Sequence, residues 1–263
     1  MEDASSKRLV ARIIAVSLLI LLGSYVLIFS LVKGVIEQEA KNHMIQQARA
    51  ITVQAEATRR YVSEMVADEV FDPSLLAEAQ KYIGRKGATS KEEILKVARL
   101  TRYYRTIPIV ASWTVGQGIA HDALYTFRVV RVNARSSKHE ATPIERQMLD
   151  KIDRDGVDEY WQIDEEINAL RYMRPIVMKK ECMLCHGSVK DYPEGQGLDP
   201  LGIKMEGWER GEQHGAFEII SDLKPMQEAI RKVQRDLLAI GMMMIVLMLL
   251  TVPIWFQMVA KKE

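Results

Sequence analysis

Two long apolar runs dominate the pattern of hydrophobic and polar positions along the chain. Residues 13–32 and 237–260 contain no charged side chain. At 1.5 Å per helical residue, each run can cross a hydrocarbon core of about 30 Å. A buried core helix is the alternative, and uncharged runs of this length disfavour it. We therefore predict two transmembrane helices, over residues 13–33 and 237–260.

The charges flanking the runs predict their orientation. Lys7, Arg8 and Arg12 precede the first run, and Lys261 and Lys262 follow the second. A secretory signal peptide has the same order of charge and apolar stretch but a shorter apolar region, so we favour an uncleaved signal anchor. Basic residues at both outer ends place both tails, 1–12 and 261–263, in the cytoplasm. Residues 34–236 then lie in the periplasm of a two-pass protein of the bacterial inner membrane.

Helical patterns occupy the first half of this middle region. Residues 35–70 contain neither glycine nor proline and are rich in Ala, Gln, Glu and Met. This composition predicts a long helix that continues out of the first span. Asp72-Pro73 ends it. Further helices are expected over residues 90–104, 143–152 and 224–236.

Short strands are predicted in the second half. Alternating or β-branched stretches mark them, and Asn168 supplies a tight turn between two of them. Helices first, then strands joined by hairpins, predict an α+β domain with an antiparallel sheet. The expected strands are residues 125–132, 160–167, 169–178 and 215–220.

Composition excludes several classes of protein. The 263 residues include 36 Lys+Arg and 35 Asp+Glu, and the mean hydropathy is −0.08. A nucleic-acid binder driven by bulk positive charge, a low-complexity chain and a disulfide-dense scaffold are all excluded. No P-loop, dinucleotide fingerprint, nucleophile elbow or H-E-x-x-H motif is present.

The only two cysteines lie in the motif Cys182-Met-Leu-Cys185-His186. This spacing attaches haem c, because the two thiols can bond the vinyl groups at one porphyrin edge while the histidine lies beneath the iron. A zinc site would need a further protein ligand and commonly has a second Cys or His pair, which is absent from the sequence. A thiol–disulfide motif is expected within a βαβ pattern and does not require the histidine. We predict one covalent haem c on Cys182 and Cys185, with His186 as the proximal iron ligand.

The ligand on the other face of the iron stays open. A third cysteine is lacking, so a thiolate is excluded. The candidates are His121, which precedes a predicted strand, Met65 on the long helix, and His43 close to the predicted membrane. His139 is expected in an exposed loop.

Charged residues near the motif suggest partners for the haem propionates. Arg171 and Arg174 fall on opposite faces of a strand, so not all arginines can serve. The arginine candidates are Arg128, Arg131, Arg135, Arg171 and Arg174. The acidic residues between 153 and 166 lack EF-hand spacing, and a solvated edge is expected there.

Blocks around the motif carry a family resemblance. They are Tyr172-Met-Arg174-Pro175, Cys182 to Gly187, and Gly207-Trp208-Glu-Arg-Gly211-Glu212 with Gly215-Ala216-Phe217. Over about residues 40–225 they resemble the PAS-like single-haem-c domain family. The segment 125–145 around Arg135 is similar too, with Ser136 and Ser137 where the family has Asn and Pro.

The resemblance implies a PAS-like antiparallel sheet that holds a covalent haem outside the cytoplasm. It implies thioether bonds at Cys182 and Cys185 and proximal ligation by His186. We also count Tyr172, Arg174 and Arg135 among the cofactor-binding candidates. Members are often sensory parts of membrane histidine kinases and chemoreceptors, whereas this chain is expected to carry no output domain after its second span.

Two functions follow as hypotheses. The first is a membrane-anchored monohaem cytochrome c that exchanges electrons with a partner complex. The alternative is a redox or gas sensor that signals through its spans to a separate protein. We expect contact with the bilayer and a protein partner, and a homodimer is a further candidate assembly. We expect neither enzymatic activity nor binding to nucleic acid.

Overall fold

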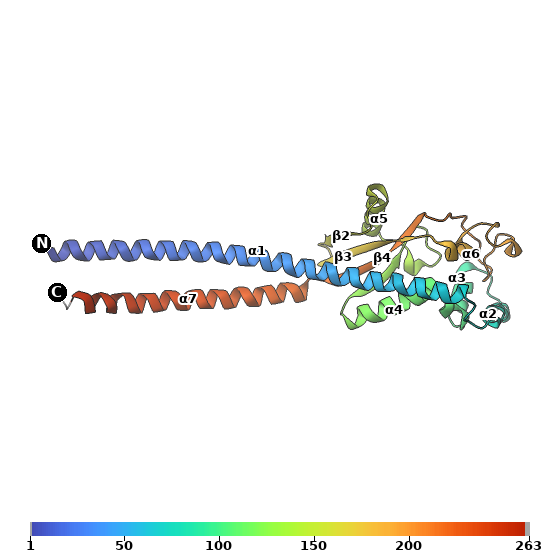
Figure 1. The fold of residues 1–263 in the computed structure, drawn as a ribbon, viewed down its shortest axis with the longest axis horizontal. Coiled ribbons are helices and arrows are strands. Elements are labelled where there is room, and N and C mark those ends of the chain that lie inside the picture. The colour runs from blue at the N-terminus through green and yellow to red at the C-terminus, as the bar shows by residue number, and fades with distance from the viewer. Residues whose placement is uncertain (1, 261–263) are drawn as a thin grey trace. The chain divides into compact units, whose positions relative to one another are not determined.

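The computed structural model describes residues 2–260, in two compact units. One contains the chain up to His43 and from Leu223 onward, and the other contains Met44–Asp222. The predicted tail 261–263 lies outside the described residues. Figure 1 colours the elements by their position along the chain.

The first unit consists of helix α7 and the part of helix α1 that precedes Met44. Helix α1 spans Glu2–Ala67 and α7 spans Lys224–Ala260. Both are long and apolar enough to cross a membrane, and their apolar windows are almost wholly exposed. The Tyr25 hydroxyl donates to the Leu237 carbonyl at 2.7 Å. Gly241 permits this approach, because a Cβ there would lie 2.6 Å from the Tyr25 ring.

Helix α1 has no break between the first apolar run and Ala67. The predicted continuation of that run into a long helix is confirmed. The helix ends at Ala67, before Asp72-Pro73, and Glu69 follows it in the left-handed region with a φ of 53°.

The second unit contains a four-stranded antiparallel sheet in the order β1-β4-β3-β2. The α+β class is therefore confirmed. Asn168 adopts a φ of 51° in the turn between β2 and β3, as predicted. The strands are β1 Thr126–Val130, β2 Tyr160–Asp164, β3 Ala169–Val177 and β4 Gln213–Asp222.

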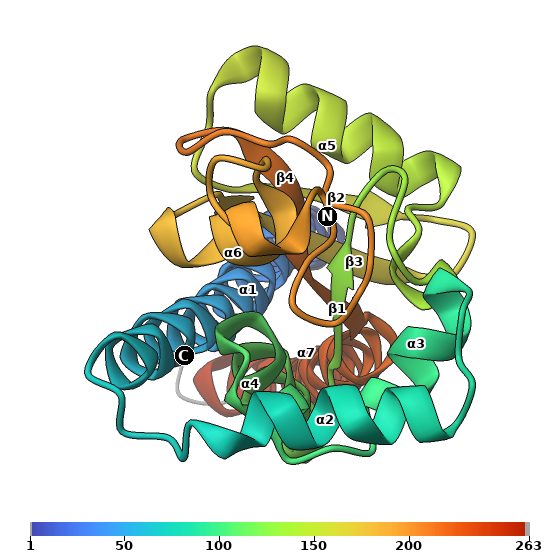
Figure 2. The same ribbon diagram turned by 90° about the vertical axis from the view of Figure 1, so that its right-hand side faces the viewer.

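Helix α5, Pro143–Asp155, packs on one face of this sheet (Figure 2). It begins with the predicted capping box, in which Thr142 and Glu145 satisfy each other's backbone donors. Met148 and Ile152 pack against Val130 and Met173 of the sheet. The same face also buries the charged side chains of Glu145, Arg171 and Glu218.

Helices on the opposite side were only partly predicted. The expected helix over 90–104 is shorter, and the sequence analysis predicted neither the helix before it nor the helix over the apolar stretch after Pro108. Glycine lowers helix propensity there, but Gly116 is required because its Cβ would lie 2.6 Å from the Phe127 ring. These elements are α2 Ser74–Arg85, α3 Lys91–Ala98, the 3₁₀ turn η1 Tyr103–Thr106, and α4 Pro108–Asp122.

Candidate functional site

The cysteine motif forms a compact turn after β3. A 3₁₀ turn, η3 Lys180–Cys182, leads directly into the one-turn helix α6 Met183–His186. The Gly187 amide closes this turn on the Met183 carbonyl at 2.9 Å. A Cβ at Gly187 would lie 2.7 Å from that carbonyl oxygen, so a larger residue would distort the turn. Cys182 and Cys185 are not joined as a disulfide.

A second segment pairs with the end of this turn. The Trp208 amide donates to the His186 carbonyl at 3.0 Å, and the Gly207 amide donates to the Gly187 carbonyl at 2.8 Å. Gly207 has a φ of 78°, which glycine adopts without strain. Two blocks separated by some twenty residues in sequence are thus joined through their backbones.

His186 is held on two sides. Its Nδ1 lies 3.0 Å from Glu206 Oε2, and its ring stacks on Trp208 at 4.4 Å with an interplanar angle of 5°. Burial lowers the pKa of His186, and the Glu206 carboxylate opposes this. A neutral His186 donates its Nδ1–H to Glu206, which leaves the Nε2 lone pair available to a metal.

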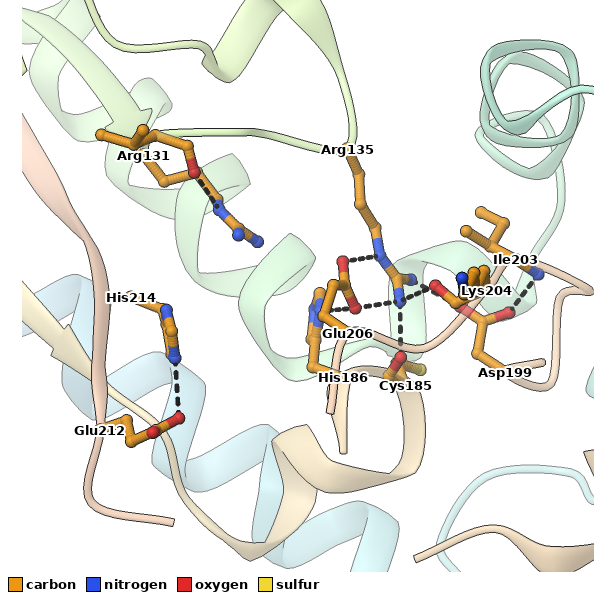
Figure 3. Close-up of polar contacts among 11 residues, drawn as sticks. Arg131, Arg135, Cys185, His186, Asp199, Ile203, Lys204, Glu206, Glu212 and His214 are labelled. Carbon is orange, nitrogen blue, oxygen red and sulfur yellow. Dashed lines mark hydrogen bonds and ion pairs between the residues drawn. The ribbon is translucent and has the colours of Figure 1, made fainter. Parts of the chain in front are cut away.

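Arg135 connects the motif to its surroundings (Figure 3). Its guanidinium donates to Glu206 Oε1 and Oε2 at 2.7 Å each, to Asp199 Oδ2 at 2.5 Å and to the Cys185 carbonyl at 2.5 Å. Burial raises the pKa of Glu206, but hydrogen bonds from His186 and Arg135 outweigh it and bring that pKa to about 2. Glu206 is therefore a carboxylate at neutral pH.

The two thiols lie in different surroundings. Burial raises the pKa of Cys185 to about 12, with Asp199 adding to the effect. Burial also raises the pKa of Cys182, whose Sγ accepts from Arg59 Nη1 at 3.5 Å. Both are therefore protonated thiols at neutral pH.

A cavity of about 160 Å³ opens beside the motif. It is smaller than the roughly 300–1,000 Å³ of typical ligand sites. Apolar side chains from α3, α4, β1 and β3 supply most of the wall, together with Arg99 and Arg131. Its other polar or aromatic lining residues include Trp113, Arg135, His139, Cys185, His186, Asp199, Trp208 and His214.

Three of the predicted site residues come together at the cavity. Cys185, His186 and Arg135 line it, and Cys182 lies on the same short turn. Tyr172 is not part of the cavity wall: it is fully buried, and its hydroxyl donates to Glu159 at 2.6 Å. Arg174 is also absent from the lining.

The charged residues of the sheet separate by face, as predicted. Arg174 pairs in register with Phe217, and Arg171 with Ile220, so the two arginines point to opposite faces. Arg171 is buried and binds Asp164 and Glu218, each at 2.7 Å. The expectation of a solvated acidic edge is wrong for Asp164, which is buried.

The proposed distal ligands do not line the cavity. His121 is exposed at the end of α4, its side chain 89% accessible, and Met65 lies near the end of α1. His43 is exposed and belongs to the other compact unit.

The prediction that His139 lies in an exposed loop is wrong. It is not exposed: it ends the 3₁₀ turn η2 Ser137–His139, is half-buried and lines the cavity. Burial lowers its pKa. Sequence reasoning also missed Glu206 and Asp199, and only the adjacent Gly207-Trp208 block gave a local signal for Glu206.

Comparison with known sequences and structures identifies the protein family. A crystal structure entitled "Crystal structure of the cyanobacterial heme-protein Tll0287" aligns with 59% of this chain and 93% of its own, at 19% identity and a TM-score of 0.34. A search of curated proteins gave no match. The sequence profile of the Tll0287-like family matches residues 37–221, well over half of the chain. The protein therefore belongs to the Tll0287-like family.

Proposed function

We propose that the unit Met44–Asp222 carries one covalent haem c on Cys182 and Cys185, with His186 as the proximal iron ligand. The observation that carries this proposal is the hydrogen bond from His186 Nδ1 to Glu206, beside two unbridged thiols. Ligand histidines characteristically donate their second nitrogen to such a carboxylate. The family takes its name from Tll0287, whose structure is described as that of a haem protein.

The residues present suit the group chemically. Two protonated thiols on one turn can add to two vinyl groups, and the imidazole follows directly in sequence. The cavity beside His186 is small for a porphyrin, so part of the haem would extend beyond it. When bound, the haem would supply a one-electron ferric–ferrous couple.

We assign the arginines near the cavity to two roles, support of the cysteine motif and binding of the haem propionates. The guanidinium of Arg135 is already engaged by Glu206, Asp199 and the Cys185 carbonyl, so we assign it to bracing the motif. Arg131 and Arg99 also line the cavity and can pair with propionates. Tyr172 and Arg174 do not line the cavity, so we assign neither of them to the group.

We further propose that the protein is a two-pass membrane cytochrome that transfers electrons to or from a partner complex. Two exposed apolar helices support the anchor. The flanking Lys and Arg residues support cytoplasmic tails and a haem on the opposite side.

One observation favours the alternative, a haem-based sensor. Helix α1 runs unbroken from the first apolar run into the proposed haem domain, and α7 begins two residues after β4 ends. Such direct connections can transmit a shift between two states.

Haem staining after denaturing electrophoresis tests the attachment. The wild-type chain should stain, and the double variant Cys182→Ser/Cys185→Ser should not. Leu184→Ser, which changes the exposed residue between the cysteines, is the matched control and should stain. An unstained wild-type band from cells with an active haem c attachment system would overturn the proposal.

The spectrum of the reduced protein separates the two roles. Reversible reduction with no response to carbon monoxide or nitric oxide supports electron transfer. Binding of either gas by the native protein favours the sensor.

A further inference from the structure

His139 supplies a second imidazole in the cavity, and its hydrogen bond leaves one ring nitrogen available to a metal. His139 Nδ1 lies 2.9 Å from the Val129 carbonyl oxygen, an atom that can only accept. The ring therefore carries its proton on Nδ1, and Nε2 keeps its lone pair. His186 has the same arrangement, with Glu206 in place of the carbonyl. Both are the hydrogen-bonding pattern of a metal-ligating histidine.

The ring plane of His139 is fixed as well. It stacks on Trp113 of α4 at 4.9 Å, with an interplanar angle of 29°. Trp113, His139 and His186 all line the same cavity. A ligand held by packing and by a hydrogen bond is preorganised for binding.

The loop that presents His139 is closed by backbone bonds. The Arg131 amide donates to the His139 carbonyl at 2.9 Å, and the Ala141 amide donates to the Arg131 carbonyl at 2.9 Å. Glu140 Oε2 accepts from the Ala134 amide at 2.7 Å. His139 thus sits on an ordered platform beside β1.

Other side chains that could ligate iron are less suited. His214 also lines the cavity, but its Nε2 lies 2.9 Å from Glu212, which leaves only Nδ1, the ring nitrogen nearer the backbone, for a metal. Its ring stacks at 4.0 Å on Trp208, the residue that stacks on His186. His214 is therefore on the same side of the cavity as His186. Met178 is the remaining competitor, since it lines the cavity and a thioether can bind haem iron.

We propose that His139 Nε2 is the second axial ligand, so that His139 and His186 bind the haem iron from opposite faces. This inference rests on the proposed haem attachment. Two imidazoles give a six-coordinate, low-spin iron without an open position for gases. This would favour the electron-transfer role over gas sensing.

The test compares three variants of the full chain, purified in detergent with haem attached. Absorption, electron paramagnetic resonance and resonance Raman spectra of the wild type should show low-spin bis-histidine iron. His139→Ala should lose the low-spin spectrum and gain carbon monoxide binding when reduced. Added free imidazole should restore the low-spin form. The matched control His214→Ala and the variant Met178→Leu should keep the wild-type spectrum.

Several outcomes would overturn the inference. They are a high-spin wild type, a low-spin His139→Ala protein that still excludes carbon monoxide, or loss of the low-spin form in Met178→Leu or His214→Ala alone. Haem staining separates these results from failure of the parent proposal. Stained His139→Ala protein with an unchanged spectrum refutes only the role of His139, whereas unstained wild-type protein refutes haem attachment.

Discussion

Glu206 Oε2 lies 3.0 Å from His186 Nδ1, and the same carboxylate receives two hydrogen bonds from Arg135. The charge on Glu206 is therefore shared between an imidazole and a guanidinium. This division sets how strongly the carboxylate can polarise the His186 ring.

Replacing Glu206 should change the electronic properties of the proposed haem. In Glu206→Gln the acceptor is neutral, so the imidazole becomes less basic and stabilises ferric iron less. The reduction potential of the haem-loaded protein should rise. Glu212→Gln, which alters the partner of His214 instead, is the control. An unchanged potential would show that the Glu206 bond does not tune the iron.

Removing Arg135 should destabilise the fold around the motif. Its side chain is 15% exposed, and the Asp199 side chain that it binds is fully buried. Arg135→Ala leaves that carboxylate without its guanidinium, and losing one partner of a buried ion pair typically costs about 3–5 kcal/mol.

Chemical denaturation followed by tryptophan fluorescence measures this cost. Arg146→Ala, which removes a half-exposed pair with Glu140, should cost about 0–1 kcal/mol. Equal effects of the two substitutions would contradict the bracing role of Arg135.

A buried carboxyl group on the opposite face of the sheet predicts a loss of stability at alkaline pH. Glu218 is fully buried, and burial followed by its contact with Glu145 raises its pKa to about 8. The folded state thus holds a proton that the unfolded chain releases near pH 4.5. This contribution is complete below the unfolded pKa and is lost as pH rises through about 8.

Glu218→Gln should remove this dependence, because glutamine resembles the protonated acid and keeps an acceptor for Arg171. Between pH 6 and 9 the wild type should lose at least about 1.4 kcal/mol, the equivalent of one pKa unit, and the variant should lose less. Thermal unfolding at several pH values measures the difference. The exposed Glu165→Gln should follow the wild type; a parallel Glu218→Gln curve would refute the assignment.

The proposed topology predicts the activity of reporter fusions. Alkaline phosphatase, which is active only outside the cytoplasm, should be inactive when fused after Glu263 and active when fused after residue 222. A green fluorescent protein fusion at Glu263 should fluoresce and serves as the complementary control. The reverse pattern would place the proposed haem domain in the cytoplasm.

Local features of the sequence predicted much of the fold. The capping box at Thr142 and Glu145, the turn at Asn168 and the apolar runs each depend on nearby residues. Helix α4 was missed because Gly116 is required by Phe127, a contact that no local pattern reports.

In the candidate site, too, local sequence patterns were predictable and long-range contacts were not. The spacing of Cys182, Cys185 and His186 is visible in the sequence, but their supporting partners are not. His139 was expected in an exposed loop, and its burial comes from Trp113 on the unforeseen α4. Glu206 reaches His186 only because the backbone of Gly207 and Trp208 pairs with the motif.

Helix α1 contains the first apolar run and also carries a side chain that contacts the proposed attachment point. Arg59 on α1 donates to Cys182 Sγ, the atom that would become a thioether. At 1.5 Å per residue, roughly 40 Å of the same helix separates Arg59 from the end of the first apolar run. Forming a thioether at Cys182 would therefore change the acceptor of Arg59, a buried side chain on the same helix that contains the first apolar run.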